Sequence, residues 1–359
     1  MKVLVIGGTG FVGPHVVRRL CRLGCEVAVF HRGRTEAELP PGVRHILCSS
    51  GVLGDRRYLA DFADELRGFA PDIVLDMIPT SESDARIVLN LFRDQARRIV
   101  AISSQDVYWA YGALIGIENG PVESTPLAED AALRKRHFPY RTDPPRKPDD
   151  PSRWMDDYEK IHVERTVLGD PELRGTILRL PMVYGPNDRQ HRMFEYLRRM
   201  EDGRPAIILE QGLAGWRWTR GYVENVAAAV ALAVTSERAA GRVYNVGERE
   251  ALPLIDWVRE IGRAAHWTGD VIAAPRDLLP DKLREVMNTD HDLMTDSTRI
   301  REELGYEESV PRDIAIARTV AWERGHPPEG TADTSPDYAT EDAVLEKLNP
   351  PRDRSRQEG

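Results

Sequence analysis

Residues 1–33 read MKVLVIGGTGFVGPHVVRRLCRLGCEVAVFHRG, and this stretch predicts a strand, a glycine-rich turn, a helix and a second strand. Residues 3–6 form a short, continuous apolar run, which is typical of a buried parallel strand. Residues 26–30 form the second apolar run, and Gly24 ends the helix between the two strands. The apolar side chains of that helix recur at helical spacing, at Val12, Val16, Val17 and Leu20. The chain therefore begins with the first unit of a parallel sheet.

The rest of the chain continues this alternation of strands and helices. Further strands are predicted at residues 43–48, 73–77, 98–103, 175–180 and 241–246, and helices at 154–168 and 223–234. Alternating units of this kind predict an α/β fold, a Rossmann-like doubly wound parallel sheet with a smaller C-terminal α/β substrate lobe. The predicted domains are residues 1–181 with 217–250 for dinucleotide binding, 182–216 with 251–325 for substrate, and a polar tail at 326–359. Residues 113–153 are rich in proline and charge and predict a surface insertion, and residues 337–348 can form a short docked helix.

Bulk composition excludes several classes of protein. The chain has 359 residues, of which 41% are hydrophobic, enough for a substantial core. We expect no membrane span, because no apolar run approaches the roughly 20 residues that a span needs, and no signal peptide. Three cysteines without a histidine cluster predict a cytoplasmic protein with neither disulfide framework nor metal site. A net charge of -9 argues against nucleic-acid binding, which needs a basic surface.

The glycine turn predicts a dinucleotide site. Gly7 permits the tight turn, Gly10 lets the backbone approach a pyrophosphate, and Gly13 allows close contact between helix and sheet. The start of the helix then faces the phosphates. The second strand ends in His31 and Arg32, where an acidic residue would bind the ribose 2′-hydroxyl of NAD. A guanidinium suits a 2′-phosphate, so the sequence favours NADP as cofactor, with NAD as the alternative.

Six motifs together resemble the extended and atypical short-chain dehydrogenase/reductases, the group of NAD-dependent nucleotide-sugar epimerases and dehydratases. They are GGTGFVG at 7–13, SSQDVY at 103–108, ILRLPMVYGPNDR at 177–189, RGYVENVA at 220–227, YNVGE at 244–248 and DSTRIREELGY at 296–306. Their order and spacing cover most of residues 1–310. The resemblance is specific for the fold and much less so for the reaction, because one fold hosts many activities.

The resemblance also implies site residues. Ser104 would bind the reacting substrate oxygen, and Arg217 and Arg220 would hold a substrate phosphate. The other expected substrate contacts are Tyr108 and Tyr184. The expected cofactor contacts are Gly7, Thr9, Gly10, Phe11, Val12, Gly13, His31, Arg32, Asp55, Pro79, Ser103, Lys160 and Pro181.

The family's catalytic pair is altered in the stretch DDYEKIHVE at residues 156–164. The family uses a tyrosine and a lysine four residues apart, on one helix face. Tyr158 and Lys160 are two apart, about 200° around a regular helix. Two alignments exclude each other: either His162 replaces the lysine behind Tyr158, or Lys160 is the family lysine and Asp156 stands in the tyrosine's place. The flanking apolar pattern favours the second alignment.

With Asp156 in that place, proton transfer would differ from the family's. Such an aspartate beside a lysine stays ionised, so it is a poor acid and a possible base. Tyr108 and Tyr111 then become alternative proton donors, by their closeness to Ser104 in the sequence. The stretch therefore predicts retained cofactor binding through Lys160 with altered acid–base chemistry.

The leading functional prediction is an NAD(P)(H)-dependent oxidoreductase, epimerase or dehydratase acting on a nucleotide sugar or a similar polar metabolite. The alternative is a nucleotide-binding sensor or RNA-associated protein without redox turnover, because some atypical relatives have lost the tyrosine–lysine pair. The resemblance further implies a homodimer that pairs the two long helices beside the active site.

Overall fold

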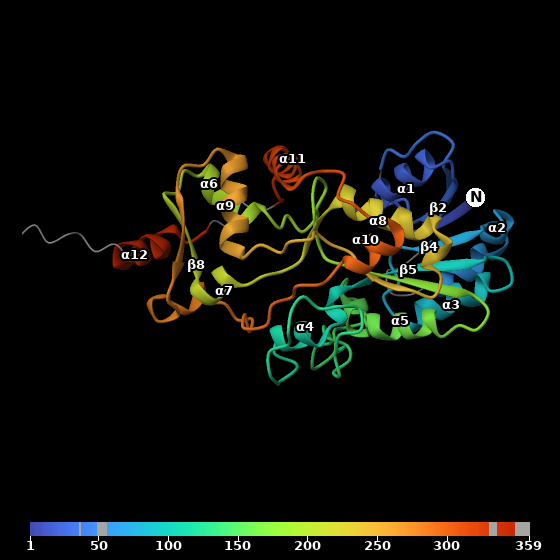
Figure 1. The fold of residues 1–359 in the computed structure, drawn as a ribbon, viewed down its shortest axis with the longest axis horizontal. Coiled ribbons are helices and arrows are strands. Elements are labelled where there is room, and N and C mark those ends of the chain that lie inside the picture. The colour runs from blue at the N-terminus through green and yellow to red at the C-terminus, as the bar shows by residue number, and fades with distance from the viewer. Residues whose placement is uncertain (36, 49–55, 330–335, 349–359) are drawn as a thin grey trace, which may run out of the picture.

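The computed structural model describes residues 1–35, 37–48, 56–329 and 336–348 (Figure 1). Its central sheet has seven strands in the order β10-β6-β5-β4-β1-β2-β3, and every pair in it is parallel. The strands are β1 Lys2–Ile6, β2 Glu26–His31, β3 Arg44–Leu47, β4 Ile73–Asp76, β5 Arg98–Ser104, β6 Arg174–Leu180 and β10 Val243–Asn245. All seven predicted strands are present, and the predicted Rossmann-like parallel sheet is confirmed.

Helices cover both faces of this sheet, as alternate side chains of β1 show. Val3 and Val5 belong to one core with side chains of α1 and α8, and Leu4 and Ile6 belong to a second core with side chains of α3 and α5. In Figure 1 the first pair of helices lies above the sheet and the second pair below it. These helices are α1 Gly13–Arg22, α8 Val223–Thr235, α3 Glu82–Phe92 and α5 Lys160–Leu168.

Apart from α8 and β10, which belong to the sheet and its helical cover, most elements after β6 build a second group beside the sheet (Figure 1). Two small parallel pairs join β7 Met182–Tyr184 to β9 Arg220–Tyr222, and β8 Ala206–Glu210 to β11 Asp270–Ala274. The other α-helices of the described chain are α2 Ala63–Gly68, α4 Trp109–Leu114, α6 Phe194–Glu201, α7 Gln211–Gly215, α9 Leu254–Ala265, α10 Thr298–Leu304, α11 Arg312–Gly325 and α12 Tyr338–Leu348. Short 3₁₀ helices occupy Arg57–Phe62, Gln105–Val107, Arg153–Asp157, Glu237–Ala239, Arg276–Leu278 and Asp281–Leu283.

The C-terminal helix α12 docks on this second group. Its Glu341 is buried and pairs with Arg199 at 2.7 Å, and Val344 packs against Ala274 and Leu279. The docked helix expected at residues 337–348 is therefore confirmed. The predicted domain boundaries stay a prediction.

The continuous helix predicted for residues 154–168 is wrong. The chain makes a 3₁₀ turn at Arg153–Asp157, runs extended through Tyr158 and Glu159, and begins α5 only at Lys160. Glu159 has φ −156° and ψ 98°, and its carboxylate accepts the Ile161 backbone N–H at 2.9 Å. The same carboxylate pairs with the buried guanidinium of Arg134 at 3.0 Å. A helix cap needs a non-helical backbone, so this cap breaks the helix between Tyr158 and Lys160.

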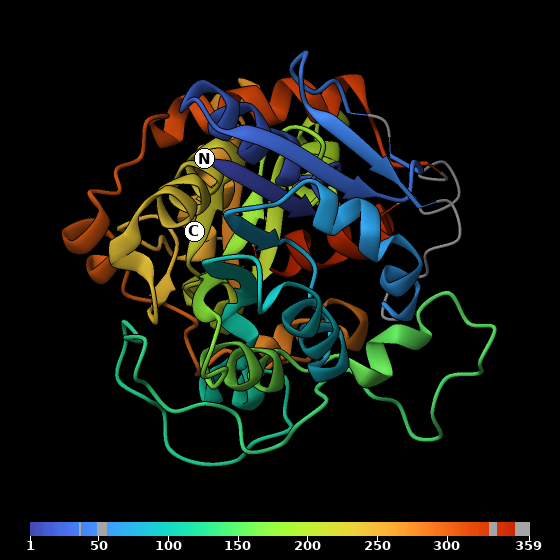
Figure 2. The same cartoon turned by 90° about the vertical axis from the view of Figure 1, so that its right-hand side faces the viewer.

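The insertion after α4 is long and irregular, as predicted, and its teal and green loops extend outward from the body of the protein (Figure 2). Two carboxylates shape it. Glu118 accepts the backbone N–H groups of Lys135 and Arg136, each at 2.7 Å. Asp156 accepts the Arg146 backbone N–H at 2.8 Å and pairs with the Arg146 side chain. Within the described ranges, no helix is both long and apolar enough to cross a bilayer.

Candidate active site

The glycine turn lies at the carboxyl end of β1, beside β4, on the edge where open α/β sheets place their ligands. Gly7 has φ +89° and donates its N–H to the Phe30 carbonyl at 3.0 Å. A Cβ on Gly13 would stand 2.6 Å from the Gly8 backbone, so α1 can approach the turn this closely only with glycine there. A Cβ on Gly10 would meet nothing within 4 Å. The turn is thus open at Gly10 and capped by the start of α1, a cradle that fits a pyrophosphate.

His31 at the end of β2 contacts His45 of the neighbouring strand β3. His31 Nε2 lies 2.9 Å from His45 Nδ1, and burial lowers the pKa of His31. Arg32 follows directly and is half-buried. Asp55, the expected adenine contact, lies outside the described residues.

Tyr158 and Lys160 meet beside Ser104 because of the break before α5. The Lys160 ammonium lies 5.6 Å from the centre of the Tyr158 ring and donates to the carbonyls of Pro79 at 2.5 Å and Ile102 at 2.9 Å. Burial lowers the pKa of Lys160 to about 8. A cavity of about 440 Å³ lies beside them. It is lined by Ser104, Gln105, Asp106, Tyr111, Tyr140, Trp154, Met155, Tyr158, Leu180, Pro181, Met182, Gln190, Arg192, Trp218 and Leu293.

The Tyr158 hydroxyl donates to the Asp106 carboxylate at 2.8 Å, and the Tyr140 hydroxyl donates to the same oxygen at 3.1 Å. The Ser104 hydroxyl oxygen accepts the Asp106 backbone N–H at 3.2 Å. Burial raises the pKa of Tyr158 well above its ordinary value, and the neighbouring carboxylate raises it further. Burial also raises the pKa of Asp106 against the opposing effect of Arg134. Two phenols and one carboxyl group are thus joined by hydrogen bonds at the wall of this cavity.

Asp156 is not among the residues that line this cavity. Its carboxylate binds Arg146 and the Thr142 backbone N–H inside the insertion, and these contacts lower its pKa although burial opposes them. The helical geometry that placed Asp156 in the tyrosine's position is absent, because the helix begins after it. The break instead brings Tyr158 itself to Lys160, an arrangement that neither alignment anticipated.

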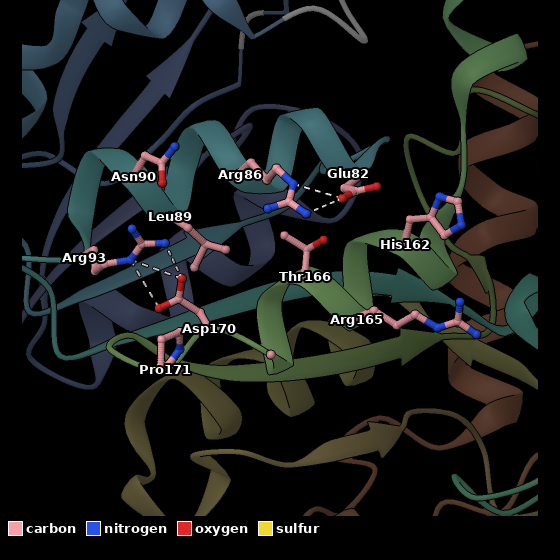
Figure 3. Close-up of a pocket in the computed structure, with 11 residues that line it drawn as sticks. Glu82, Arg86, Leu89, Asn90, Arg93, His162, Arg165, Thr166, Asp170 and Pro171 are labelled. Carbon is pink, nitrogen blue, oxygen red and sulfur yellow. Dashed lines mark hydrogen bonds and ion pairs between the residues drawn. The ribbon is translucent and has the colours of Figure 1, made fainter.

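His162, the lysine substitute of the other alignment, lies in an outer cleft between α3 and α5, seen in Figure 3. Its ring lies 4.5 Å from that of His137. Two of the arginines that line this cleft have carboxylate partners: Arg86 binds Glu82 and Arg93 binds Asp170. The cleft is thus a polar surface in which these two charges are paired.

Three residues that were predicted to contact cofactor or substrate instead form hydrogen bonds with other residues of the protein. The Ser103 hydroxyl donates to Glu164 at 2.5 Å, and Glu164 also binds Arg179 through both of its oxygens. The Tyr108 hydroxyl is fully buried and donates to Asn245 at 2.6 Å, and its pKa rises to about 12 with burial. The Tyr184 hydroxyl donates to Glu248 at 2.8 Å. None of the three lines the cavity beside Ser104.

A second cavity of about 750 Å³ adjoins the first and shares Met182, Gln190, Arg192 and Trp218 with it. Arg220 lines this second cavity, with its guanidinium carbon 4.5 Å above the ring of Trp257. Arg220 Nε is buried and has no hydrogen-bond partner within the described chain. Arg217 instead donates to the Ala251 carbonyl at 2.9 Å and is not among the residues lining either cavity.

Sequence reasoning missed Asp106, Tyr140, Trp154 and Trp218. Asp106 carried a usable signal, because it stands two residues beyond Ser104 at the end of a predicted strand. Tyr140 carried none, because it lies in the irregular insertion and reaches the site only through tertiary contacts. In the described part of the chain no three metal-ligating side chains cluster together.

The parallel sheet, the glycine turn and the grouping of Ser104, Tyr158 and Lys160 define a member of the short-chain dehydrogenase/reductase superfamily. The profile of the NAD dependent epimerase/dehydratase family matches residues 3–126 and 136–247, and the chain belongs to this family.

Individual relatives are more distant. A 2'-dehydrokanamycin reductase of Streptomyces kanamyceticus is 26% identical over 294 residues, which are 79% of this chain and 72% of that protein. The uncharacterized protein YbjS of Escherichia coli strain K12 is 26% identical over 347 residues, which are 91% and 98% of the two chains.

Solved structures share the fold. The UDP-glucose 4-epimerase of Thermotoga maritima, solved with UDP-glucose, has a TM-score of 0.63 at 19% identity and covers 90% of this chain and 99% of its own. The UDP-glucose 4-epimerase of Thermus thermophilus, solved with NAD, has a TM-score of 0.60 at 23% identity and covers 91% and 100%.

Proposed function

We propose that the protein is an NAD(P)(H)-dependent oxidoreductase that interconverts a hydroxyl and a keto group on a nucleotide-linked sugar or a similar polar, anionic metabolite. The observation that carries this proposal is that Ser104 and Tyr158 line one cavity at the carboxyl edge of the sheet, with the Lys160 ammonium beside the Tyr158 ring. A bound nicotinamide would supply the hydride acceptor or donor. Ser104 and Tyr158 would hold the reacting oxygen, and Lys160 would hold the nicotinamide ribose beside Pro79.

The glycine turn would hold the pyrophosphate and Arg32 the 2′-phosphate, which favours NADP over NAD. Thr9 and the backbone at Phe11 and Val12 complete this cradle. Pro181, which lines the first cavity, would bound the nicotinamide side.

An anionic substrate fits the second cavity better than a polycationic one. Arg220 Nε and Trp218 Nε1 are buried donors without a partner within the described residues. Buried donors of this kind are costly unless a ligand satisfies them. A diphosphate offers charged oxygens at this position, whereas an aminoglycoside like that of the Streptomyces relative would add positive charge beside Arg220.

The test is a panel of reactions with purified protein. We expect NADPH to bind, detected by fluorescence, and a keto or hydroxy nucleotide sugar to change the reduced-nicotinamide absorbance. Arg220→Met should raise the KM for a nucleotide sugar at least tenfold, while the affinity for NADPH stays the same. Activity on aminoglycosides and none on sugar nucleotides would contradict the substrate class.

The alternative without redox turnover makes a different prediction. A nucleotide-binding sensor would bind NADPH, and no sugar nucleotide would change the absorbance of the bound cofactor. The proposal also includes a homodimer that forms through α3 and α5. Sedimentation tests it by comparing the oligomeric state of the wild type with that of Arg86→Glu. The polar lining of that surface makes charge the variable to change.

A further inference from the structure

The function proposed for Ser104, Tyr158 and Lys160 assigns no role to Asp106, although its carboxylate lies in the same site. It is 6% exposed and lines the cavity with Ser104 and Tyr158. One of its oxygens accepts two phenolic hydrogens, from Tyr158 and Tyr140. The other oxygen is buried and has no hydrogen-bond partner in the described chain.

This arrangement commits the single proton of Tyr158 to Asp106. The phenolic oxygen of Tyr158 then has lone pairs left to accept a hydrogen bond from a substrate hydroxyl, and cannot donate to a substrate carbonyl without turning away. The buried carboxylate also opposes ionisation of the tyrosine. Tyr158 is thus arranged to pass a proton on rather than to hold a negative charge.

We propose that Asp106 receives the Tyr158 proton when a substrate hydroxyl is oxidised, so that Tyr158 and Asp106 form a two-step proton relay. The inference rests on the proposed function. A bound oxidised nicotinamide would accept hydride from the substrate carbon, and the substrate O–H proton moves to the Tyr158 oxygen. The Tyr158 proton moves to Asp106, the carbon–oxygen double bond forms, and reduction reverses each transfer.

The insertion completes the relay. It carries Tyr140 to the Asp106 carboxylate, and the Tyr140 hydroxyl lies 2.9 Å from that of Tyr111. Both tyrosines are half-buried, so this chain of hydroxyls offers a path for the proton to leave Asp106. The charged groups that face Asp106 are Arg134, from the insertion, and Lys160, from α5, and both favour its ionised form.

The first test uses no substrate. Tyrosinate absorbance is followed against pH in wild type, Asp106→Asn and Tyr158→Phe. The titration step that is missing in Tyr158→Phe belongs to Tyr158. We expect Asp106→Asn to move that step to lower pH, because a negative charge 2.8 Å away is removed. An unchanged step in a folded Asp106→Asn protein overturns the relay.

The second test uses turnover. Asp106→Asn should lower kcat about 100-fold or more, the usual contribution of a positioned acid–base group, and should abolish the fall in oxidation rate at low pH. Asp106→Glu should restore that pH dependence, which a purely structural role would not predict. Tyr140→Phe keeps the carboxylate and removes one donor, so it should move the fall in rate to higher pH, and no movement would contradict the proposal.

The two proposals fail separately. A lowered tyrosinate step without hydride transfer to any substrate would overturn the proposed function and leave the coupling of Asp106 to Tyr158 intact. Normal turnover in Asp106→Asn with an unchanged step would overturn the relay and leave the proposed function intact.

Discussion

Lys160 holds its ammonium nitrogen 5.6 Å from the centre of the Tyr158 ring, although only one residue separates the two in the chain. In a regular helix they would lie on opposite sides. The helix instead begins at Lys160, and Tyr158 is extended. Because the helix begins at Lys160, the tyrosine and the lysine lie close together despite their unusual spacing in the sequence.

Tyr158→Phe and Asp156→Asn should separate catalysis from structure. We expect Tyr158→Phe to lower kcat at least 100-fold with little change in NADPH affinity, because it removes a proton-transferring hydroxyl. Asp156→Asn should lower the melting temperature and leave kcat per folded molecule within a fewfold of wild type. Steady-state kinetics and thermal melts measure both, and the reverse pattern would restore Asp156 to the catalytic role predicted from the sequence.

Lys160 should make stability rise with pH. Its pKa is about 8 in the folded protein and about 10.4 when unfolded, so the unfolded state binds more protons between these values. The free energy of unfolding should therefore increase from pH 8 to pH 10 by up to about 3 kcal/mol from this group. Urea unfolding of wild type and Lys160→Met at several pH values isolates the effect. Parallel pH curves for the two proteins would contradict it.

Gly10 and Gly13 should respond differently to alanine. Gly10→Ala meets no protein atom, so we expect an unchanged melting temperature with at least tenfold weaker cofactor binding. Gly13→Ala collides with the Gly8 backbone and should lower the stability itself. Gly68→Ala, exposed and without neighbours within 4 Å, is the matched control. Tight cofactor binding by Gly10→Ala would contradict the placement of the pyrophosphate at this turn.

Arg32→Ala should discriminate between the two cofactors. Losing a guanidinium that binds a 2′-phosphate should weaken NADPH about tenfold or more and leave NADH nearly unchanged, because only NADPH carries that phosphate. Arg44→Ala, at the start of β3 and also in an exposed ion pair, controls for the loss of one positive charge. Equal affinity of Arg32→Ala and wild type for NADPH would reject the NADP assignment.

The buried pair of Glu164 and Arg179 should matter for folding rather than for chemistry. Removing one partner of a buried ion pair leaves an uncompensated charge and costs about 3–5 kcal/mol. We expect Glu164→Gln to destabilise by about that much, whereas Glu82→Gln, which breaks an exposed pair with Arg86, should cost about 1 kcal/mol or less. Chemical denaturation compares them directly.

The amino-acid sequence by itself determined the parallel sheet, the glycine turn and the positions of Ser104 and Lys160. These features follow from local patterns: apolar runs, helical periodicity and glycines whose backbone geometry other residues cannot adopt. Neighbouring residues carry all of the information that such predictions need.

Only the tertiary structure decided which side chain lies beside Lys160. Glu159 caps the start of α5 and binds Arg134, 25 residues earlier in the chain, so the helix begins after Tyr158 and Tyr158 lines the cavity with Ser104. Tyr140 reaches Asp106 from an insertion without periodicity. An ion pair between distant residues outweighed the local helical pattern, and periodicity within one segment carries no information about such a partner.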